Sequence, residues 1–337
     1  MGLGIISAIG KTPLIQLSKF WEDSKFNIFA KLEFLNPGGS IKDRPALNII
    51  HCGLETGQID SNTVVIESSS GNMAIGLAQA CSYFNLSFIC VVDSKTTTQN
   101  LQLLKLYGAK IDIIEQPDPV TGEFLQARLN RVKTLCNLIP NSFWPNQYGN
   151  YLNPEVHHQT MDEIVRDLGE QVDYLFVATS TCGTIRGCGE YCRTHNLKTK
   201  VIAVDALGSK ISGNEQAERL IPGLGAGIKP EHCKAELIDK FVQVSSLDCV
   251  VGCRHLARTE TILAGGSAGG IAMAIAKMYS EIPAGSNCVA ILPDRGERYL
   301  DTVYSDTWVR DKFGEVDNLW KQPIKVLHSN SLVMSSS

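Results

Sequence analysis

Four short turns rich in Gly, Ser and Asn stand out in this 337-residue chain as places where an anion could bind. Each is followed by a helical pattern, and three of them come after a strand pattern directly or within a few residues. Because a helix N-terminus presents free N–H groups and a partial positive charge, each turn can hold an anionic group. Four such turns indicate an elaborate polyanionic or zwitterionic ligand. They read PGGSIKDRP over 37–45, SSSGN over 68–72, STCGT over 180–184 and AGGSAGG over 264–270.

The first turn also carries a lysine, Lys42, just before a helical pattern whose first turn accommodates Pro45. Near helix N–H dipoles and inside a cleft, an ammonium group loses stability, so the pKa of this lysine should fall. A neutral lysine forms imines with aldehydes. The alternatives are a solvated lysine or a phosphate-binding point charge of the P-loop kind. The P-loop pattern GxxxxGK[ST] is absent, because Asp43 follows Lys42.

Dinucleotide binding is another general interpretation of glycine-rich turns. The nearest glycine cluster, residues 223–227, has the spacing GxGxG and follows Pro222 instead of a strand. A Rossmann fingerprint requires GxGxxG directly after a strand, so this cluster only weakly supports dinucleotide binding.

The cysteines and histidines do not form a metal-binding pattern. Eleven cysteines are spread along the chain, mostly in apolar runs, without a CxxC pair or an HExxH motif. The nearest approaches, Cys188/Cys192 and Cys249/Cys253, have one residue too many between the sulfurs for a zinc knuckle. We therefore expect reduced cysteines that pack as small hydrophobic residues, and no metal. The adjacent histidines at 157–158 point about 100° apart on a helix and are expected at a surface or an interface.

Short β-branched runs alternate with amphipathic stretches along most of the chain, which predicts a three-layer α/β fold with mainly parallel strands. Several runs are apolar throughout, as in strands buried on both faces. Asn153 and Pro154 supply an N-cap and a first-turn proline for a helix reaching Leu168, and the helix over 98–107 ends at Gly108. The expected strands cover residues 27–34, 63–67, 88–93, 110–115, 174–178, 200–205 and 287–292.

Composition argues against nucleic-acid and membrane partners. The chain has 31 basic and 35 acidic side chains, a formal net charge of −4, and no run of five basic residues. The longest uncharged stretch, 68–92, is interrupted by polar residues and is not expected to span a membrane. The N-terminus lacks the features of a secretory signal or a myristoylation motif, so a cytoplasmic location is the expectation. We expect small-molecule partners.

Together these residues resemble a known family, the fold type II pyridoxal-phosphate (PLP) enzymes of the cysteine synthase and cystathionine β-synthase group. The similarity is collinear from about residue 6 to residue 300, and NPGGSIKDRPA, ESSSGN, STCGT, PGLGAG and AGGSAGG occur in the family's order. It implies a tryptophan synthase β-like fold of two three-layer domains with mainly parallel sheets. It also implies a homodimer, a large PLP-binding domain over 1–36 and 147–327, and a smaller, mobile substrate-loop domain over 37–146. Residues 328–337 have the composition of a disordered tail.

The resemblance assigns a role to each motif. Lys42 matches the lysine that forms the imine with PLP and can then act as base for the substrate Cα proton. Asn72 matches the asparagine that bonds the phenolic oxygen of PLP, and Ser267 matches the serine facing the pyridine nitrogen. A hydroxyl leaves that nitrogen unprotonated, which favours β-elimination and replacement over transamination. The loop that cups the cofactor phosphate is matched by Ser180, Thr181, Cys182, Gly183 and Thr184. The groups that take the substrate α-carboxylate are matched by Ser69, Ser70 and Gln147.

Three positions depart from the usual cysteine synthase motifs and indicate a nucleophile other than sulfide. Ser180 replaces the first glycine of GTGGT, Met73 replaces the last threonine of TSGNT, and Tyr148 replaces the phenylalanine of QF. A side chain at Ser180 narrows the cavity and adds a hydrogen-bond donor. With the segments 92–93, 100–101, 144–150 and 292–308, these residues resemble the N-(2-amino-2-carboxyethyl)-L-glutamate synthases of siderophore pathways, which supply 2,3-diaminopropionate.

The subfamily resemblance implies O-phospho-L-serine as the electrophile and the α-amine of L-glutamate as the nucleophile. Tyr148 and Ser180 would orient the bound substrates. Arg128, in the helical stretch 122–137, matches an arginine of that subfamily and is the candidate for binding the glutamate side-chain carboxylate. The alternative for Arg128 is a solvated helix arginine. Arg295 and Arg298 are expected to be structural partners of neighbouring acidic residues and are left out of the site.

Three other functions stay open from the sequence. A cysteine synthase would combine O-phosphoserine or O-acetylserine with sulfide. A serine/threonine deaminase would let the eliminated product hydrolyse. A binding protein that keeps the fold without catalysis is the third, and Lys42 in an intact PGGSIKD segment argues against it.

Overall fold

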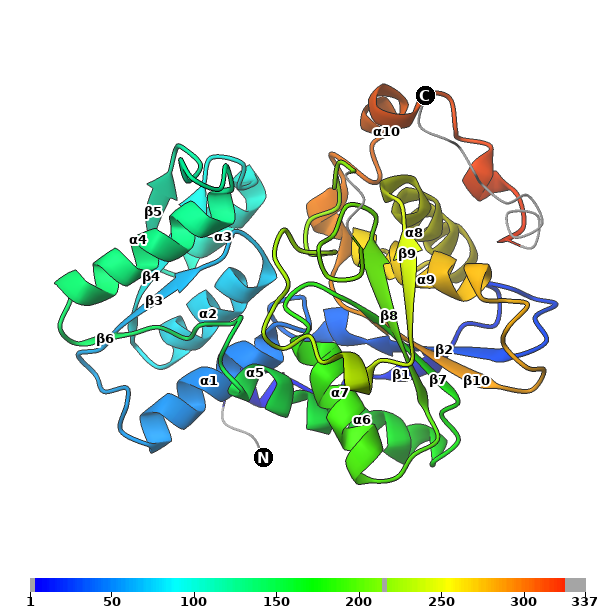
Figure 1. Cartoon of the computed structure of the whole chain (residues 1–337), viewed down its shortest axis with the longest axis horizontal. Coiled ribbons are helices and arrows are strands. Elements are labelled where there is room, and N and C mark those ends of the chain that lie inside the picture. Colours follow the sequence, from blue (N-terminus) through cyan, green and yellow to red (C-terminus); the bar gives the residue numbers. More distant parts are fainter. Residues whose placement is uncertain (1–3, 214–216, 325–337) are drawn as a thin grey trace.

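The computed structural model describes residues 4–213 and 217–324 and contains two β-sheets (Figure 1). The smaller sheet lies at the left of Figure 1 and the larger sheet at the right. The larger sheet has the order β1 (Leu14–Gln16), β2 (Asn27–Leu32), β10 (Asn287–Leu292), β7 (Tyr174–Ala178), β8 (Lys200–Ala206) and β9 (Lys240–Val244). The smaller sheet has the order β5 (Lys110–Ile114), β4 (Ser87–Asp93), β3 (Val64–Ser68) and β6 (Ser142–Phe143). Only the β1–β2 pair is antiparallel among the described strands, so the α/β fold with mainly parallel sheets is confirmed.

Helices cover both faces of each sheet. Helices α8 and α9 pack on one face of the larger sheet, and α6 and α7 pack on the other. Helices α1 and α2 cover one face of the smaller sheet, and α4 covers the opposite face. The α-helices are α1 (Asp43–Glu55), α2 (Asn72–Tyr83), α3 (Thr98–Leu106), α4 (Phe124–Leu138), α5 (Leu152–Glu155), α6 (His157–Leu168), α7 (Gly183–Thr194), α8 (Ser246–Glu260), α9 (Gly266–Lys277) and α10 (Asp306–Phe313). Short 3₁₀ turns are η1 (Ile5–Ala8), η2 (Glu33–Leu35), η3 (Ala235–Leu237), η4 (Gly296–Tyr299) and η5 (Leu319–Lys321).

Strands with both faces covered explain the continuous apolar runs of the sequence. Successive side chains of a strand point to opposite faces. Val65 of β3 therefore enters the core beneath α1 and α2, while the next residue, Ile66, enters the core beneath α4. In the same way Leu175 and Phe176 of β7 enter different cores of the larger sheet.

Each predicted strand lies within or overlaps a strand of the structure, but the prediction for residues 27–34 runs too far. Residues 33–34 belong to η2, where the buried Glu33 carboxylate turns inward and lies 2.7 Å from the guanidinium of Arg44. Strands β1 and β6 were not predicted because they have only three and two residues. Strand β9, which was also not predicted, is five residues long and lies at the sheet edge, where partly buried and buried residues alternate after the exposed Lys240.

The predicted N-cap at Asn153 is wrong. Helix α5 begins at Leu152, and α6 follows from His157 to Leu168, so Asn153 lies inside a helical turn. Its side chain instead donates from Nδ2 to the carbonyl of Gln147 (2.7 Å) and to Thr181 Oγ1 (3.4 Å). A tertiary hydrogen bond therefore takes the place of the expected cap. The other helix prediction is confirmed, because α3 ends at Leu106 and Gly108 adopts φ +81°.

All eleven cysteines carry free thiols, as predicted, and eight of them are buried. Within the described ranges, no helix is long and apolar enough to span a bilayer. No group of three or more His, Cys, Asp or Glu in the part of the chain that the structure describes could hold a metal ion. The strands of the smaller sheet all fall between Val64 and Phe143. The domain boundaries remain predictions, and the predicted tail at 328–337 lies outside the described residues.

Candidate active site

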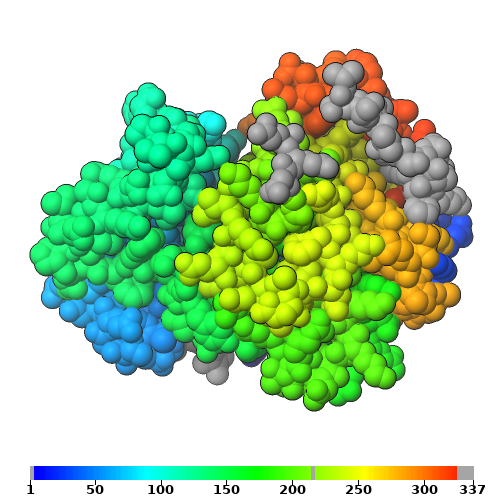
Figure 2. Space-filling model, viewed as in Figure 1, coloured from blue at the N-terminus to red at the C-terminus, as the bar shows by residue number. Residues whose placement is uncertain are grey.

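A cavity of about 400 Å³ lies between the two sheets and is lined by residues of all four Gly/Ser/Asn turns. Ser68 ends β3, Ala178 ends β7 and Pro293 follows β10, so the cavity is bounded by carboxyl ends of parallel strands from both sheets. Ligands of open α/β sheets bind at this edge. In Figure 2 the surface is notched between the cyan-to-green residues of the smaller sheet and the rest of the molecule.

Lys42 reaches the cavity from the turn before α1. Gly39 adopts φ +86°, a backbone conformation that favours glycine, and the chain then enters the helix at Asp43. Burial lowers the pKa of Lys42 to about 8, while the nearby Cys182 and Asp294 act in the opposite direction. The predicted fall in this pKa is confirmed. An amine with a pKa near 8 is partly neutral at physiological pH, as imine formation requires.

The lowered pKa should make Lys42 costly for the stability of the PLP-free protein. The protonated amine is disfavoured in the folded state, so the cost is fully present below about pH 8 and disappears as pH rises toward 10.5. We expect Lys42→Met to raise the unfolding free energy of the PLP-free protein by roughly 1 to 3 kcal/mol at pH 7. Urea unfolding at pH 7, 8.5 and 10.5 checks this. A difference between parent and variant that stays constant over this range would contradict it.

The turn after β7 forms a cup at the start of α7. Helix α7 begins at Gly183, and its first-turn N–H groups lack intrahelical acceptors, as at any helix N-terminus. A Cβ at Gly183 would lie 2.3 Å from Asn153 Oδ1, so only glycine fits there. Cys182, the N-cap, has the left-handed angles φ 63° and ψ 9°, and its thiol lies 4.0 Å from the carbonyl oxygen of Ser180. Ser180 and Thr181 complete a loop suited to an anionic group.

His157 lies behind this loop, and the expectation that it lies at a surface or an interface is wrong. It is fully buried, with Nδ1 3.1 Å from Thr160 Oγ1 and Nε2 3.2 Å from Thr184 Oγ1. Burial holds the pKa of His157 well below its usual value, so the ring is neutral. It fixes the hydroxyl of Thr184 next to the cup. His158, half-buried, lies 3.3 Å from Glu190.

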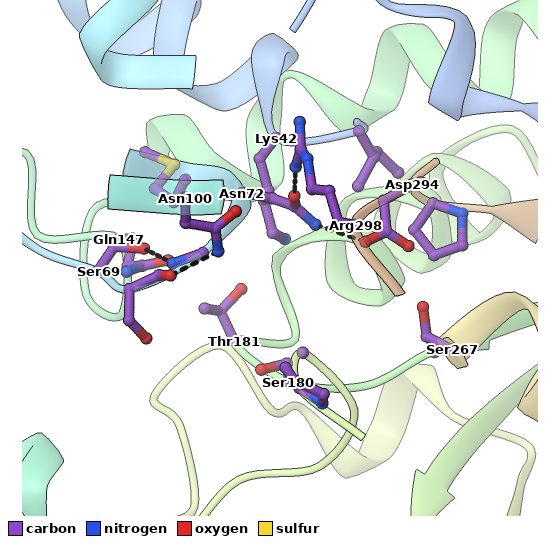
Figure 3. A pocket seen from close by; sticks show the side chains of 18 of the residues that line it. Lys42, Ser69, Asn72, Asn100, Gln147, Ser180, Thr181, Ser267, Asp294 and Arg298 are labelled. Atoms are coloured by element: carbon purple, nitrogen blue, oxygen red, sulfur yellow. Dashed lines mark hydrogen bonds between the residues drawn. The ribbon is translucent and has the colours of Figure 1, made fainter. Parts of the chain in front are cut away.

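The turn after β3 and the segment after β6 meet on another wall of the cavity (Figure 3). Ser69 Oγ accepts from the N–H groups of Gly71 (3.4 Å) and Ala74 (3.2 Å). Gln147 Nε2 donates to the carbonyl of Ser68 at 3.0 Å, and Asn100 Nδ2 donates to the carbonyl of Ser70 at 2.9 Å. The structure thus brings the predicted groups Ser69, Ser70 and Gln147 together.

A buried carboxylate fixes Gln147. Glu67 accepts hydrogen bonds from the backbone N–H of Ser68 (2.7 Å) and of Gln147 (3.1 Å), and from Trp144 Nε1 (3.2 Å). Burial raises the pKa of Glu67 to about 7 despite these bonds. Glu67 opens the ESSSGN motif but was not among the predicted site residues.

Arg298 belongs to the site, and the prediction that it pairs with neighbouring acidic residues is wrong. Its Nη1 donates to Asn72 Oδ1, and its Nη2 donates to the carbonyl of Gly38 at 2.6 Å. Asn72 Nδ2 in turn donates to Asp294 Oδ2 at 2.9 Å. Ser267, in the first turn of α9, lies on the neighbouring wall (Figure 3). Arg295, by contrast, donates from Nε to the carbonyl of Phe34 at 2.9 Å.

Arg128 reaches the cavity from α4, and its alternative interpretation as a solvated arginine is wrong. The residue is only 9% exposed. Its Nη1 lies 3.3 Å from Asp93 Oδ2, but Nε and Nη1 have no hydrogen-bond partner among the described residues. Tyr148 lines the same cavity, and burial raises its pKa, so its phenol is a neutral donor. A guanidinium in the cavity wall favours an anionic ligand there.

These features fit an aldehyde that carries a phosphate. The cavity offers an amine of lowered pKa at Lys42, a helix N-terminus at Gly183, and the Ser267 hydroxyl on the neighbouring wall. Pyridoxal phosphate has this combination of groups.

Comparisons with known proteins agree. A family profile described as "Pyridoxal-phosphate dependent enzyme" matches residues 5–294. The structure of an O-acetylserine-dependent cystathionine β-synthase from Helicobacter pylori is 32% identical, with 90% of this chain and 100% of that chain covered and a TM-score of 0.84. The structure of O-acetylserine sulfhydrylase isoform 3 from Entamoeba histolytica is 30% identical, with 90% of this chain and 92% of that chain covered and a TM-score of 0.83. The structure of an O-ureido-L-serine synthase is 27% identical, with 95% of this chain and 99% of that chain covered and a TM-score of 0.83.

The chain therefore belongs to the pyridoxal-phosphate-dependent enzymes, and PLP is its cofactor. Within them it is a fold type II enzyme of the cysteine synthase and cystathionine β-synthase type, whose reaction is β-replacement on an amino acid.

Proposed function

We propose that the protein joins O-phospho-L-serine to the α-amine of L-glutamate and thereby makes N-(2-amino-2-carboxyethyl)-L-glutamate for 2,3-diaminopropionate biosynthesis. The Cβ–O bond of phosphoserine breaks, and phosphate leaves with its electron pair. A bond forms between that Cβ and the glutamate nitrogen, which loses a proton. PLP, when bound, supplies the electron sink that makes loss of the Cα proton possible.

The proposed roles follow the cavity walls. Lys42 would hold PLP covalently and, when released by the substrate, accept the Cα proton at Nζ. Asn72 would bond the phenolic oxygen, and Ser267 would face the ring nitrogen. The loop residues that would hold the phosphate are Ser180, Thr181, Cys182, Gly183 and Thr184. The groups that would hold the substrate α-carboxylate are Ser69, Ser70 and Gln147.

The observation that carries the choice of second substrate is Arg128. Its guanidinium lines the cavity wall, with Nη1 3.3 Å from Asp93 Oδ2. Sulfide is small and needs no such group, whereas the side-chain carboxylate of glutamate would pair with this cation. Tyr148 and Ser180 line the same cavity and would orient the two substrates.

A product assay tests this proposal against the alternatives. The PLP-loaded protein is mixed with O-phosphoserine or O-acetylserine and offered glutamate or sulfide, and products are identified by mass spectrometry. The N-(2-amino-2-carboxyethyl)-L-glutamate conjugate supports the proposal. Cysteine as the sole product would reject it in favour of a cysteine synthase, as two of the similar structures are named for O-acetylserine. Pyruvate alone would indicate a deaminase.

Arg128→Met should raise the KM for glutamate by about 10- to 100-fold, because charge-assisted hydrogen bonds contribute about 1.5 to 3 kcal/mol. The KM for O-phosphoserine and the absorbance of bound PLP should change little. Arg131→Met is a matched control on the same helix, since Arg131 pairs with Asp112 near the surface (2.7 Å). An Arg128→Met variant with unchanged KM for glutamate would remove the main support for this substrate.

The proposal has three further parts: a homodimer, a cytoplasmic location, and closure of the 37–146 unit over bound substrate. The family resemblance supports the first and the third. Light scattering of the purified protein tests the first. Hydrogen exchange with and without O-phosphoserine tests the third, because closure should protect the segment that contains Ser69 and Ser70.

A further inference from the structure

Both ends of the Asn72 side-chain amide are hydrogen-bonded, and the two partners allow only one orientation of the amide. Arg298 can only donate, so the atom facing its Nη1 must be the carbonyl oxygen Oδ1. Asp294 Oδ2, 2.9 Å from the other end, accepts from Nδ2. Figure 3 shows this chain of Arg298, Asn72 and Asp294 beside Lys42. A flipped amide would set a carbonyl against a carboxylate and an NH₂ against a guanidinium.

The two residues that orient Asn72 are themselves held in place. Arg298 Nη2 donates to the carbonyl of Gly38 at 2.6 Å, next to the turn that leads to Lys42. Asp294 is 2% exposed and accepts a second hydrogen bond from Tyr299 Oη at 2.6 Å. The orientation of the Asn72 amide is therefore built into the cavity before any ligand enters.

An amide NH₂ has two hydrogens, and Asp294 takes one of them. The second hydrogen of Asn72 Nδ2 remains for the cavity. The positive charge of Arg298 lies at the other end of the same amide, where both of its acceptors are neutral. Donor and charge together favour an oxygen with negative charge at this wall.

We propose that Arg298 is a positioning residue for the cofactor, which acts by fixing Asn72 as a hydrogen-bond donor to the phenolic oxygen of PLP. This inference rests on the role proposed above for Asn72. Arg298 would not touch the substrate. Arg298 would act only through the Asn72 amide, so its effect on PLP binding should vanish when that amide is removed.

A double-mutant cycle measured without amino-acid substrates tests this. PLP is titrated into the PLP-free forms of the parent, Arg298→Met, Asn72→Ala and the double variant, and affinity and the visible absorption maximum are recorded. We expect Arg298→Met to weaken PLP binding by about tenfold and to displace the maximum, because the phenolic oxygen loses an oriented donor. Arg298→Lys should restore most of the affinity. In the Asn72→Ala background, Arg298→Met should change affinity less than about twofold.

Arg295→Met is the matched control, because Arg295 lies three residues earlier and bonds the Phe34 carbonyl. It should leave affinity and the absorption maximum as in the parent. Urea unfolding of the PLP-free variants identifies a folding defect, and Arg298→Gln replaces Arg298→Met if the latter does not fold. An Arg298→Met protein with parental affinity and maximum would overturn the inference, and so would effects that multiply in the double variant. Failure of the glutamate assay would leave these titrations unaffected, whereas a parent that does not bind PLP would overturn both proposals.

Discussion

Replacement of Lys42 by alanine is expected to lower turnover by about 10³-fold or more, because both covalent attachment of PLP and transfer of the Cα proton are assigned to this one amine. Its Nζ lies in the cavity between the two sheets with a pKa near 8. Steady-state product formation measures the turnover. Loss of the visible absorbance of Lys42-bound PLP measures the loss of covalent attachment, without any substrate.

The cavity offers a matched control, because Lys95 also lines it. Lys95→Ala should keep the visible absorbance that Lys42→Ala loses, and added ethylamine should restore part of the turnover of Lys42→Ala by replacing the missing base. A Lys42→Ala protein with turnover within tenfold of the parent would show that another group carries the chemistry. The role of the PGGSIKDRP turn over 37–45 would then be structural.

The part of the site that could be predicted is local in the chain. A helix start after a glycine-rich turn can bind anions through its own N–H groups, and the composition of 68–72 and 180–184 was enough to predict the helix starts that line the cavity. The lowered pKa of Lys42 was predicted from its place at a helix start inside a cleft, and burial is its main cause. The strands of the core were predictable because both of their faces are covered.

The contacts that were missed join distant segments. Arg298 and Asn72 are separated by 226 positions, and nothing in either segment shows that the other faces it. His157 was expected with His158 at a surface or an interface, whereas its partner Thr184 lies on another helix. Asn153 has the composition of an N-cap, but its hydrogen bond to Gln147 across a turn prevails over that local preference. Side-chain partners of this kind depend on the packed fold.

The segment that carries Lys42 is anchored two residues later by a buried ion cluster. Arg44, 2% exposed, bonds Glu33 through Nε (2.7 Å) and Nη2 (2.8 Å), and Glu163 through Nη1 (2.8 Å) and Nη2 (2.7 Å). Lys31 Nζ lies 2.8 Å from Glu163 Oε2. Two cations therefore balance two carboxylates and join α1, β2, η2 and α6 next to the active site.

Arg44→Met should lower the unfolding free energy by about 3 to 5 kcal/mol, because it leaves Glu33 buried without its cation. Burial raises the pKa of Glu163, but hydrogen bonds from Arg44 and Lys31 prevail and lower it to about 2. The stability that Glu163 contributes is therefore present above its unfolded pKa of about 4.3 and is lost only as pH falls toward 2. Without Arg44 that loss should begin at higher pH. Urea unfolding between pH 3 and 7 measures both effects.

Arg193→Met is the comparison, because Arg193 pairs with Asp239 at 2.9 Å near the surface, where such pairs contribute about 0 to 1 kcal/mol. Arg44→Lys should lie between the two, since an ammonium cannot make two bidentate pairs. If Arg44→Met were no less stable than Arg193→Met, the cluster would not anchor α1. The low exposure of all four side chains argues otherwise: water cannot reach Glu33 to replace the guanidinium, so the first turn of α1, and Lys42 with it, should shift when Arg44 is lost.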